Sequence, residues 1–338
     1  MKLYDKQSLN EYHQSLTYDD ISLIPTEISR MKSRKEVDTS SNFLGIKLAV
    51  PIVSSPMESV TGIDMARELY KLGCLGIVNR FDSSLDELLK NKNGTRKIIA
   101  ISIALNTPID VVKKLSEGRK IICIDTANAS NREVLKKTEQ VKKNVDLKVI
   151  VGNIAHGASL KHLVDSGADG VRVGIGSGSV CSTSIQTGIG IGQVSSLLNV
   201  LFARKENKLK IAIIADGGVK GAGDVAKAIA LGADAVMLGR LLAGTRETPG
   251  EVIRYSDQLW KKYRGSASFG VKMKNEFIEG EETMVAYKGA VANVVNAVSD
   301  GLRSSMSYMN CRTIEELRKI ETFAVLSNYS YLERLPKP

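Results

Sequence analysis

Short apolar runs alternate with longer amphipathic segments along most of this chain. Each run is rich in β-branched residues and apolar at consecutive positions, as expected of strands that are buried on both faces. The segments between them have apolar residues at helical spacing, and one of them, GAGDVAKAIALG at 221–232, closes on Gly232. The pattern predicts eight strands, at about 49–57, 75–79, 98–103, 120–125, 148–153, 170–175, 210–216 and 235–239.

Eight strand–helix units in series predict an α/β fold, the (β/α)8 TIM barrel. A doubly wound open sheet is the alternative, but eight consecutive units favour closure. Because such barrels commonly reach about 250 residues and more, we expect the 338 residues to form a single catalytic domain, 1–338, without an internal linker. Residues 1–48 are expected to wrap the barrel, and residues 290–338 to hold one helix and a tail rich in Tyr, Ser and Pro.

Polar residues and glycines follow several of the predicted strands. Asp125 ends the fourth strand, Asn153 the fifth, and Gly239-Arg240 the eighth. Glycine-rich turns follow the sixth strand at 174–176 and the seventh at 216–218. Because barrel enzymes build their active sites at the carboxyl ends of the strands, we expect these residues to meet in one site.

Composition and charge indicate a globular protein and argue against a membrane protein or a nucleic-acid-binding protein. Hydrophobic residues make up 43% of the chain and charged residues 25%, which is ordinary for a globular protein with a large core. No apolar run approaches the length of a membrane span, and the first residues lack the pattern of a secretory signal. The net charge is +10, but the lysines are scattered and aromatic residues are only 5%. This pattern is typical of a solvated surface, so neither nucleic acid nor membrane is expected as a partner.

The four cysteines, Cys74, Cys123, Cys181 and Cys311, are far apart and form no CxxC motif. Neither a zinc site nor a disulfide framework is therefore indicated. Reduced thiols point to the cytoplasm. Cys123 sits inside the apolar run IICID and is expected to be a core residue.

The loop after the sixth predicted strand, GIGSGSVCSTSIQTGIGIGQ at 174–193, carries the candidate chemistry. Its glycines and hydroxyl residues would present several main-chain N–H groups to an anion, usually a phosphate. A cysteine in such an electropositive loop has a lowered pKa and is nucleophilic. A flexible surface loop with an incidental cysteine is the other interpretation, and composition alone leaves both open.

This loop resembles the catalytic loop of the IMP dehydrogenase/GMP reductase family, whose pattern is roughly G-x-G-S-x-C-x-T. Gly176, Gly178, Ser179, Cys181 and Thr183 match that pattern. The resemblance covers nearly the whole chain. Further matching segments are LTYDD (16–20), SPMESV (55–60), ADGG (215–218), MLGRLLAGTRETPGE (237–251), YRG (263–265) and GLRSSMSY (301–308).

The resemblance implies how a purine nucleoside monophosphate would bind. Cys181 would add to C2 of the purine and form a covalent intermediate. The other substrate-binding residues would be Ser179, Gly218, Gly239 and Tyr263 around the 5′-phosphate, Asp216 at the ribose hydroxyls, and Gly265 and Ser266 at the base. Arg240 would also contact the substrate.

The resemblance also implies a cofactor, a cation and an assembly. Asp125, Asn128 and Ser304 would lie on the side where a nicotinamide cofactor approaches. Gly176, Gly178 and Cys181 would offer main-chain carbonyls to a monovalent cation such as K⁺, if one binds. A homotetramer is usual in the family.

Two enzymes share this scaffold. The dehydrogenase takes a hydride from IMP with NAD and then hydrolyses the covalent adduct to XMP. The reductase expels ammonia from GMP and then receives a hydride from NADPH, giving IMP, which is a step of purine salvage. The cysteine step is common to both, so the residues that distinguish them act in the second half of the reaction.

The dehydrogenase needs a base to activate water, which the family supplies as an Arg–Tyr pair on a long flap after the YRG segment. In this chain the flap is almost absent, and the segment 270–279, GVKMKNEFIE, contains neither arginine nor tyrosine. Lys272 and Lys274 are conceivable substitutes, but solvated loop lysines are the more common interpretation. A regulatory insert common in dehydrogenases is also missing, which weighs little because some dehydrogenases lack it.

The reductase needs a proton donor for the leaving amine, because ammonia leaves carbon far more readily than the amide anion does. The family uses the threonine of the cysteine loop together with a glutamate, and Thr183 and Glu279 occupy those positions. The pair Ala127-Asn128 is also reductase-like. The sequence therefore predicts an NADPH-dependent GMP reductase.

Three alternatives stay open. TRETPGE (245–251) and SFGVKM (268–273) look more like an NAD-dependent IMP dehydrogenase. Ser184, Ser266 and Glu276 depart from the family pattern around the substrate, which would suit another purine nucleotide, such as a deoxynucleotide. A nucleotide-binding protein without turnover is the last alternative, and the Cys181–Thr183–Glu279 set argues against it.

Overall fold

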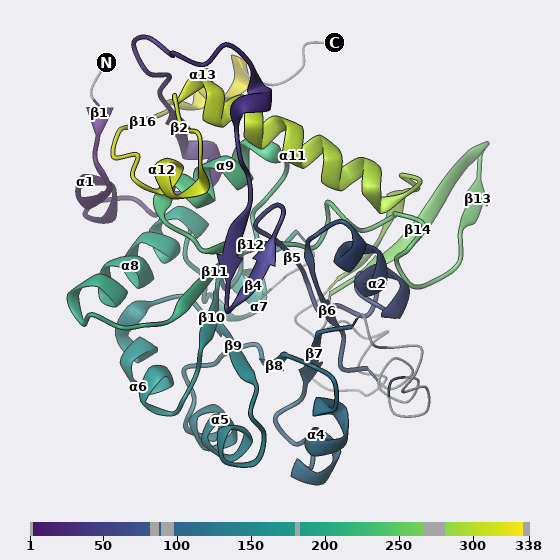
Figure 1. Ribbon diagram of the computed structural model, residues 1–338. Coiled ribbons are helices and arrows are strands. Elements are labelled where there is room, and N and C mark those ends of the chain that lie inside the picture. Colours follow the sequence, from purple (N-terminus) through teal and green to yellow (C-terminus); the bar gives the residue numbers. More distant parts are fainter. Residues whose placement is uncertain (1–2, 82–87, 89–97, 180–182, 266–280, 334–338) are drawn as a thin grey trace.

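In the computed structural model, which describes residues 3–81, 88, 98–179, 183–265 and 281–333, eight parallel strands close into a barrel (Figure 1). The last barrel strand pairs with the first through Val236 and Ile52. The predicted (β/α)8 barrel is therefore confirmed, and the open sheet is excluded. In the order of the chain, the barrel strands are β5 (Ile52–Ser54), β6 (Leu75–Val78), β7 (Ala100–Ile103), β8 (Ile121–Asp125), β9 (Lys148–Ile154), β10 (Gly170–Val173), β11 (Ala212–Asp216) and β12 (Ala235–Leu238).

Each barrel strand lies within or close to one apolar run of the sequence, because its side chains are buried on both faces. One set of alternate residues fills the barrel interior and includes Cys123, which is fully buried as expected of a core residue. The other set packs against the helices. A hairpin of β3 (Ser41–Phe43) and β4 (Ile46–Leu48) adds Phe43 and Leu48 to the interior cluster, and so closes the amino end of the barrel.

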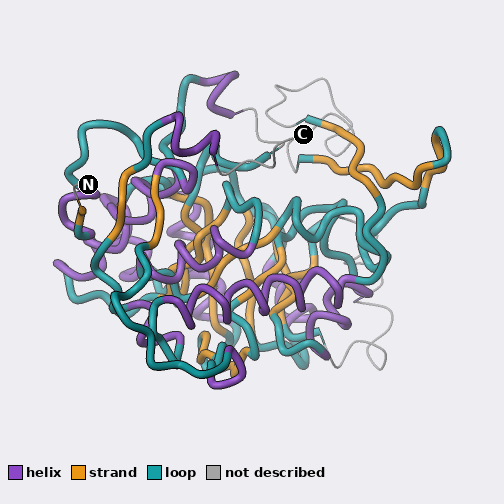
Figure 2. Tube along the Cα trace, turned by 90° about the horizontal axis from the view of Figure 1, so that it is seen from above, coloured by secondary structure: helices purple, strands orange, loops and turns teal. Residues whose placement is uncertain are grey.

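The helices lie outside the strands (Figure 2). α5 illustrates why they form: the side chain of Asn131 accepts the N–H of Glu133 at its start, and Val134 and Val141 place a buried stripe at helical spacing. α9 ends at Gly232, whose φ of 124° suits glycine. Around the barrel run α2 (Ile63–Lys71), α4 (Ile109–Ser116), α5 (Arg132–Asn144), α6 (Leu160–Asp165), α8 (Gln193–Glu206), α9 (Ala222–Leu231) and α11 (Val291–Tyr308), with the 3₁₀ turn η4 (Gly157–Ser159) before α6. The short α7 (Thr183–Thr187) lies in the loop between β10 and α8.

The segment 290–338 holds more structure than the expected helix and tail. α12 (Ile314–Arg318), β16 (Phe323–Val325) and α13 (Asn328–Glu333) follow α11. β16 pairs on one side with β1 (Leu3–Tyr4) and on the other with β2 (Ile21–Leu23), so that both ends of the described chain join one small sheet. The remaining elements before the barrel are α1 (Lys6–Asn10), η1 (Tyr18–Asp20) and η2 (Arg34–Glu36).

A further, three-stranded antiparallel sheet leaves the barrel after β12. Its strands are β13 (Ile253–Tyr255), β14 (Gln258–Arg264) and β15 (Glu282–Ala286). The β13–β14 hairpin extends beyond the ring of helices (Figures 1 and 2), whereas the end of β14 returns to the barrel mouth. Among the described helices, none combines the length and the hydropathy needed to cross a membrane.

Candidate active site

A cavity of about 320 Å³ opens at the carboxyl end of the barrel. Six of the predicted substrate-binding residues line it: Ser179, Asp216, Gly218, Gly239, Arg240 and Tyr263. Ser55 and Met57, from the SPM segment after β5, lie on its wall, as does Gly178 of the cysteine loop. The cavity falls within the usual range for small-molecule sites, about 300–1,000 Å³.

Tyr263 brings a phenol to one corner of this cavity. It lies on β14, outside the barrel, and its side chain is buried. Its hydroxyl accepts a hydrogen bond from Ser179 Oγ at 3.4 Å and lies 3.9 Å from Met57 Sδ. A Cβ at Gly239 would lie 3.2 Å from the same hydroxyl, so a larger residue there would crowd it. Burial raises the pKa of Tyr263, which therefore remains a neutral hydrogen-bond donor at physiological pH.

Three basic residues surround the same corner. Lys288 Nζ donates to the carbonyls of Arg240 at 2.8 Å and Leu241 at 3.0 Å, and Lys220 forms an ion pair with Asp19. Arg240 is exposed at the cavity and forms no ion pair with any other described residue. A guanidinium without a carboxylate partner among the described residues, beside a neutral phenol, suits a phosphate group.

The loop that follows β10 is held by close backbone packing and by side-chain hydrogen bonds. Gly174 has a φ of 143°, and a Cβ there would lie 2.0 Å from the carbonyl oxygen of Asp216. Ser177 Oγ donates to Gln193 Oε1 at 2.9 Å, and Gln193 Nε2 donates in turn to the carbonyl of Val173 at 2.7 Å. The loop is thereby held in place up to Ser177, ahead of the segment that contains Cys181.

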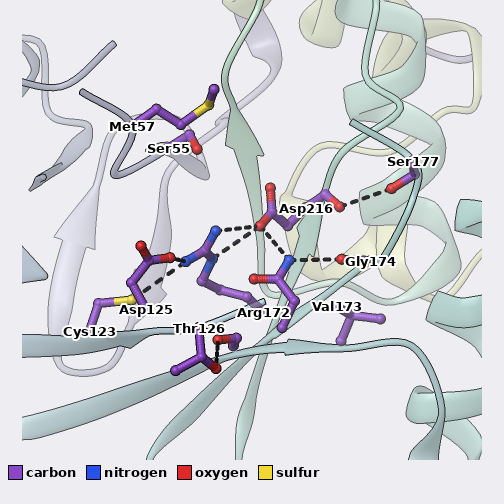
Figure 3. A network of polar contacts seen from close by, with 12 residues as sticks. Ser55, Met57, Cys123, Asp125, Thr126, Arg172, Val173, Gly174, Ser177 and Asp216 are labelled. Carbon is purple, nitrogen blue, oxygen red and sulfur yellow. Dashed lines mark hydrogen bonds and ion pairs between the residues drawn. The ribbon is translucent and has the colours of Figure 1, made fainter. Parts of the chain in front are cut away.

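An ionic network crosses the barrel mouth beside the cavity (Figure 3). Arg172, on β10, donates from one terminal nitrogen to Asp125 Oδ1 at 2.6 Å, and from Nε and the other terminal nitrogen to Asp216 Oδ2 at 3.0 and 2.9 Å. Asn153 Nδ2 donates to the same Asp216 oxygen at 2.7 Å. On the far side, Arg80 Nε donates to Asp125 Oδ2 at 3.0 Å.

Burial and charge act in opposite directions on Arg172. Burial alone would lower its pKa, but the carboxylates of Asp216 and Asp125 outweigh burial and raise the pKa above its ordinary value. Arg172 is therefore a permanent cation between two acids. In sequence it is a single charged residue within the apolar run GVRVGI, and a charge in a strand buried on both faces signals a buried ion pair. Arg172 was not among the site residues predicted from the sequence.

The lining of the cavity does not include four other predicted residues that the structure describes, Thr183, Gly265, Asn128 and Ser304. Thr183 begins α7 and is half-buried, and Gly265 follows β14 with its N–H donating to the carbonyl of Glu281 at 2.9 Å. Asn128 is exposed after β8, and its Oδ1 accepts the N–H of Ser130. Ser304 lies on α11, where it accepts a hydrogen bond from Arg34 at 2.7 Å, and is not a cavity residue.

Three predicted residues, Cys181, Ser266 and Glu279, lie outside the described residues, as do Lys272, Lys274 and Glu276. Within the described ranges, no cluster of three or more His, Cys, Asp or Glu residues is arranged to hold a metal ion. No described residue donates a hydrogen bond to the carbonyl of Gly176 or Gly178.

Comparison with known proteins gives the family. Residues 15–337 match the family model described as the IMP dehydrogenase / GMP reductase domain. The chain is 31% identical to the inosine-5′-monophosphate dehydrogenase of Cryptosporidium parvum over 93% of this chain and 92% of that protein. It is 35% identical to the GMP reductase of Streptococcus gordonii, over 95% and 97%, and 32% identical to that of Bacillus subtilis, over 92% and 96%. Relatives of both names are thus about equally similar.

Proposed function

Because the chain belongs to the IMP dehydrogenase/GMP reductase family, whose members are oxidoreductases of purine nucleotides, we propose that it is an NADPH-dependent GMP reductase. It converts GMP to IMP and ammonia through a covalent adduct between Cys181 and purine C2. The assembly and location that accompany this proposal are a homotetramer in the cytoplasm.

The proposal that the substrate is a nucleotide rests on one observation: groups suited to bind a phosphate and a ribose line the same cavity. Tyr263, Ser179 and Arg240 offer a phenol, a hydroxyl and a guanidinium to a 5′-phosphate at one corner. Asp216 presents a carboxylate to the ribose hydroxyls on another wall. The volume of about 320 Å³ is suitable for a mononucleotide.

The short segment after YRG favours the reductase. Hydrolysis of the adduct needs a base that activates water, and the segment 270–279 supplies neither the arginine nor the tyrosine of the family flap. The reductase needs no water-activating base. It needs a proton donor for the leaving amine, and Thr183 with Glu279 serve as that donor.

The residues divide the chemistry as follows. Cys181 Sγ attacks C2 as a thiolate, the amino group leaves as ammonia after receiving a proton from the Thr183–Glu279 pair, and the thiolate departs again when C2 becomes the C–H of IMP. When bound, the reduced nicotinamide supplies one hydride to C2, so that GMP, NADPH and two protons give IMP, NADP⁺ and ammonium. Arg240 and Tyr263 hold the phosphate, which keeps C2 at the sulfur.

Asn128, on the expected cofactor side, fits an amide-bearing ring. The exposed Asn128 keeps its Nδ2 free of hydrogen bonds to any described residue, and an amide complements the nicotinamide carboxamide. A monovalent cation fits at Gly176 and Gly178, because no described residue donates a hydrogen bond to either main-chain carbonyl, and such carbonyl oxygens are the ligands that K⁺ prefers.

An NAD-dependent IMP dehydrogenase is the second candidate. The 31% identity to the Cryptosporidium parvum enzyme and the TRETPGE segment favour it. A reductase for another purine nucleotide is the third, because Ser184, Ser266 and Glu276 depart from the family pattern.

Nicotinamide absorbance separates the candidates. Purified protein is mixed with GMP and NADPH in one cuvette and with IMP and NAD in another, and Cys181→Ala serves as the control in both. Loss of absorbance in the first, with release of ammonia, is the expected result. A gain in the second instead means that the protein is the dehydrogenase. No change in either contradicts both and favours another purine or a protein without turnover.

A further inference from the structure

The guanidinium of Arg172 is buried and paired with two carboxylates, and none of the roles proposed above explains this arrangement. Its side chain is only 8% exposed, and its stem passes over Gly152, where a Cβ would lie 2.5 Å from Arg172 Cβ. A buried charge is stable only when it is paired and hydrogen-bonded, and Arg172 has a carboxylate on each side, Asp125 and Asp216. Arg80 holds Asp125 from behind at 3.0 Å, so the acid that anchors Arg172 is itself fixed.

The two oxygens of Asp216 have unequal surroundings. Oδ2 accepts three hydrogen bonds, two from Arg172 and one from Asn153. Oδ1 accepts none from any described residue, and in Figure 3 it points away from Arg172. Since Asp216 lines the cavity, Oδ1 is the oxygen that is left for a ligand.

We propose that Arg172 is a positioning residue for ribose recognition: it acts through Asp216, and the group recognised is the 2′,3′-diol of a ribonucleotide. Two N–H bonds to one oxygen and a third to Asp125 fix the rotation of the Asp216 carboxylate, so that Oδ1 faces the cavity. A lysine, which is a point charge on a flexible stem, cannot make this planar set of contacts. The inference rests on the proposed function, because that function makes Asp216 the ribose-binding residue.

The test compares nucleotides that differ only in the diol. Affinities of the full chain for GMP and for 2′,3′-dideoxy-GMP are measured by titration calorimetry without cofactor. We expect the wild type to prefer GMP, and Arg172→Lys to lose on the order of tenfold of that preference, the effect of one hydrogen bond to a charged group. The affinity for the dideoxy nucleotide should change little. Asp216→Asn should behave in the same way, and the double variant should be no worse than Asp216→Asn alone.

Lysine is chosen because it keeps the charge, whereas an apolar residue would leave two buried acids unpaired and put folding at risk. Arg204→Lys is the matched control: Arg204 forms an ion pair with Asp234 away from the cavity. Its loss should leave the diol preference unchanged.

Three results would overturn the inference. The wild type could bind both nucleotides equally well, Arg172→Lys could keep the preference for GMP, or Arg172→Lys could lower the affinity for both nucleotides by the same factor. The titrations are repeated with IMP and its dideoxy form, because this separates the inference from the proposed function. If GMP reduction is absent but Arg172→Lys still loses the preference for the IMP diol, the reductase proposal fails and the inference stands. If reduction is present but the preference survives the substitution, the inference alone fails.

Discussion

Replacing Tyr263 with phenylalanine tests the phosphate corner of the cavity. Among the described residues, the hydroxyl makes only long contacts, 3.4 Å to Ser179 Oγ and 3.9 Å to Met57 Sδ. Its removal should therefore cost less than about 1 kcal/mol of folding free energy. A bound phosphate changes the balance, because the phenol then donates a charge-assisted hydrogen bond worth roughly 1.5–3 kcal/mol. Tyr263→Phe should consequently weaken GMP binding by about 10- to 150-fold.

Guanosine provides the internal comparison, since it has the base and ribose of GMP but no phosphate. Calorimetric titration of wild type and Tyr263→Phe with both ligands should show the loss for GMP and almost none for guanosine. Tyr255→Phe is the matched control, because Tyr255 lies on the projecting β13 and is 72% exposed. Equal weakening of guanosine and GMP, or unchanged GMP binding, would refute the assignment of this corner to phosphate.

Three further predictions concern the rest of the molecule. Cys181 should be alkylated faster than the other three cysteines, because burial raises their pKa values to about 11 or about 12, and bound nucleotide should slow its alkylation. The rates are measured by peptide mass spectrometry, and equal rates at all four cysteines would remove the case for an activated thiol. Gly174→Ala should destabilise the fold by more than about 2 kcal/mol, because its Cβ would lie 2.0 Å from the Asp216 carbonyl oxygen. Gly118→Ala, at a φ of 72° with open space around it, should cost only about 1 kcal/mol of backbone strain, and similar losses in urea unfolding would contradict the clash. Burial would raise the pKa of Asp169, but hydrogen bonds from a main-chain N–H and two lysines lower it. The wild type should therefore be more stable than Asp169→Asn at neutral pH, and this difference in unfolding free energy should vanish as the pH falls below 3.8, the ordinary pKa of an aspartate.

The barrel could be predicted from the sequence because its strands are buried on both faces, and continuous apolar runs are the direct mark of that environment. The three-residue β16 could not be, because a strand that short has no periodicity of its own. It exists because β1 and β2, about 300 residues away in the chain, flank it.

Some residues of the candidate site could likewise be predicted from the sequence, and others could not. The rule that barrel sites form at the carboxyl ends of strands brings Asp216 and Gly239 together without any structure. It says nothing of Tyr263, which reaches the cavity from a sheet outside the barrel, and only the family resemblance pointed to it. The partners of Arg172 are beyond prediction from one sequence, because they lie 44 and 47 positions away and depend on which strands are neighbours.

The ionic network also has a consequence for how the barrel folds. Asn153, Arg172 and Asp216 come from the consecutive strands β9, β10 and β11, and they meet only when these strands pair in the native register. A slip of β10 by one residue would turn Arg172 from the barrel interior toward the helices, where an unpaired guanidinium costs several kcal/mol. An apolar residue at this position would fit either face at little cost. The charged residues therefore favour the native strand register. Hydrophobic burial alone would stabilise a misaligned barrel almost as well.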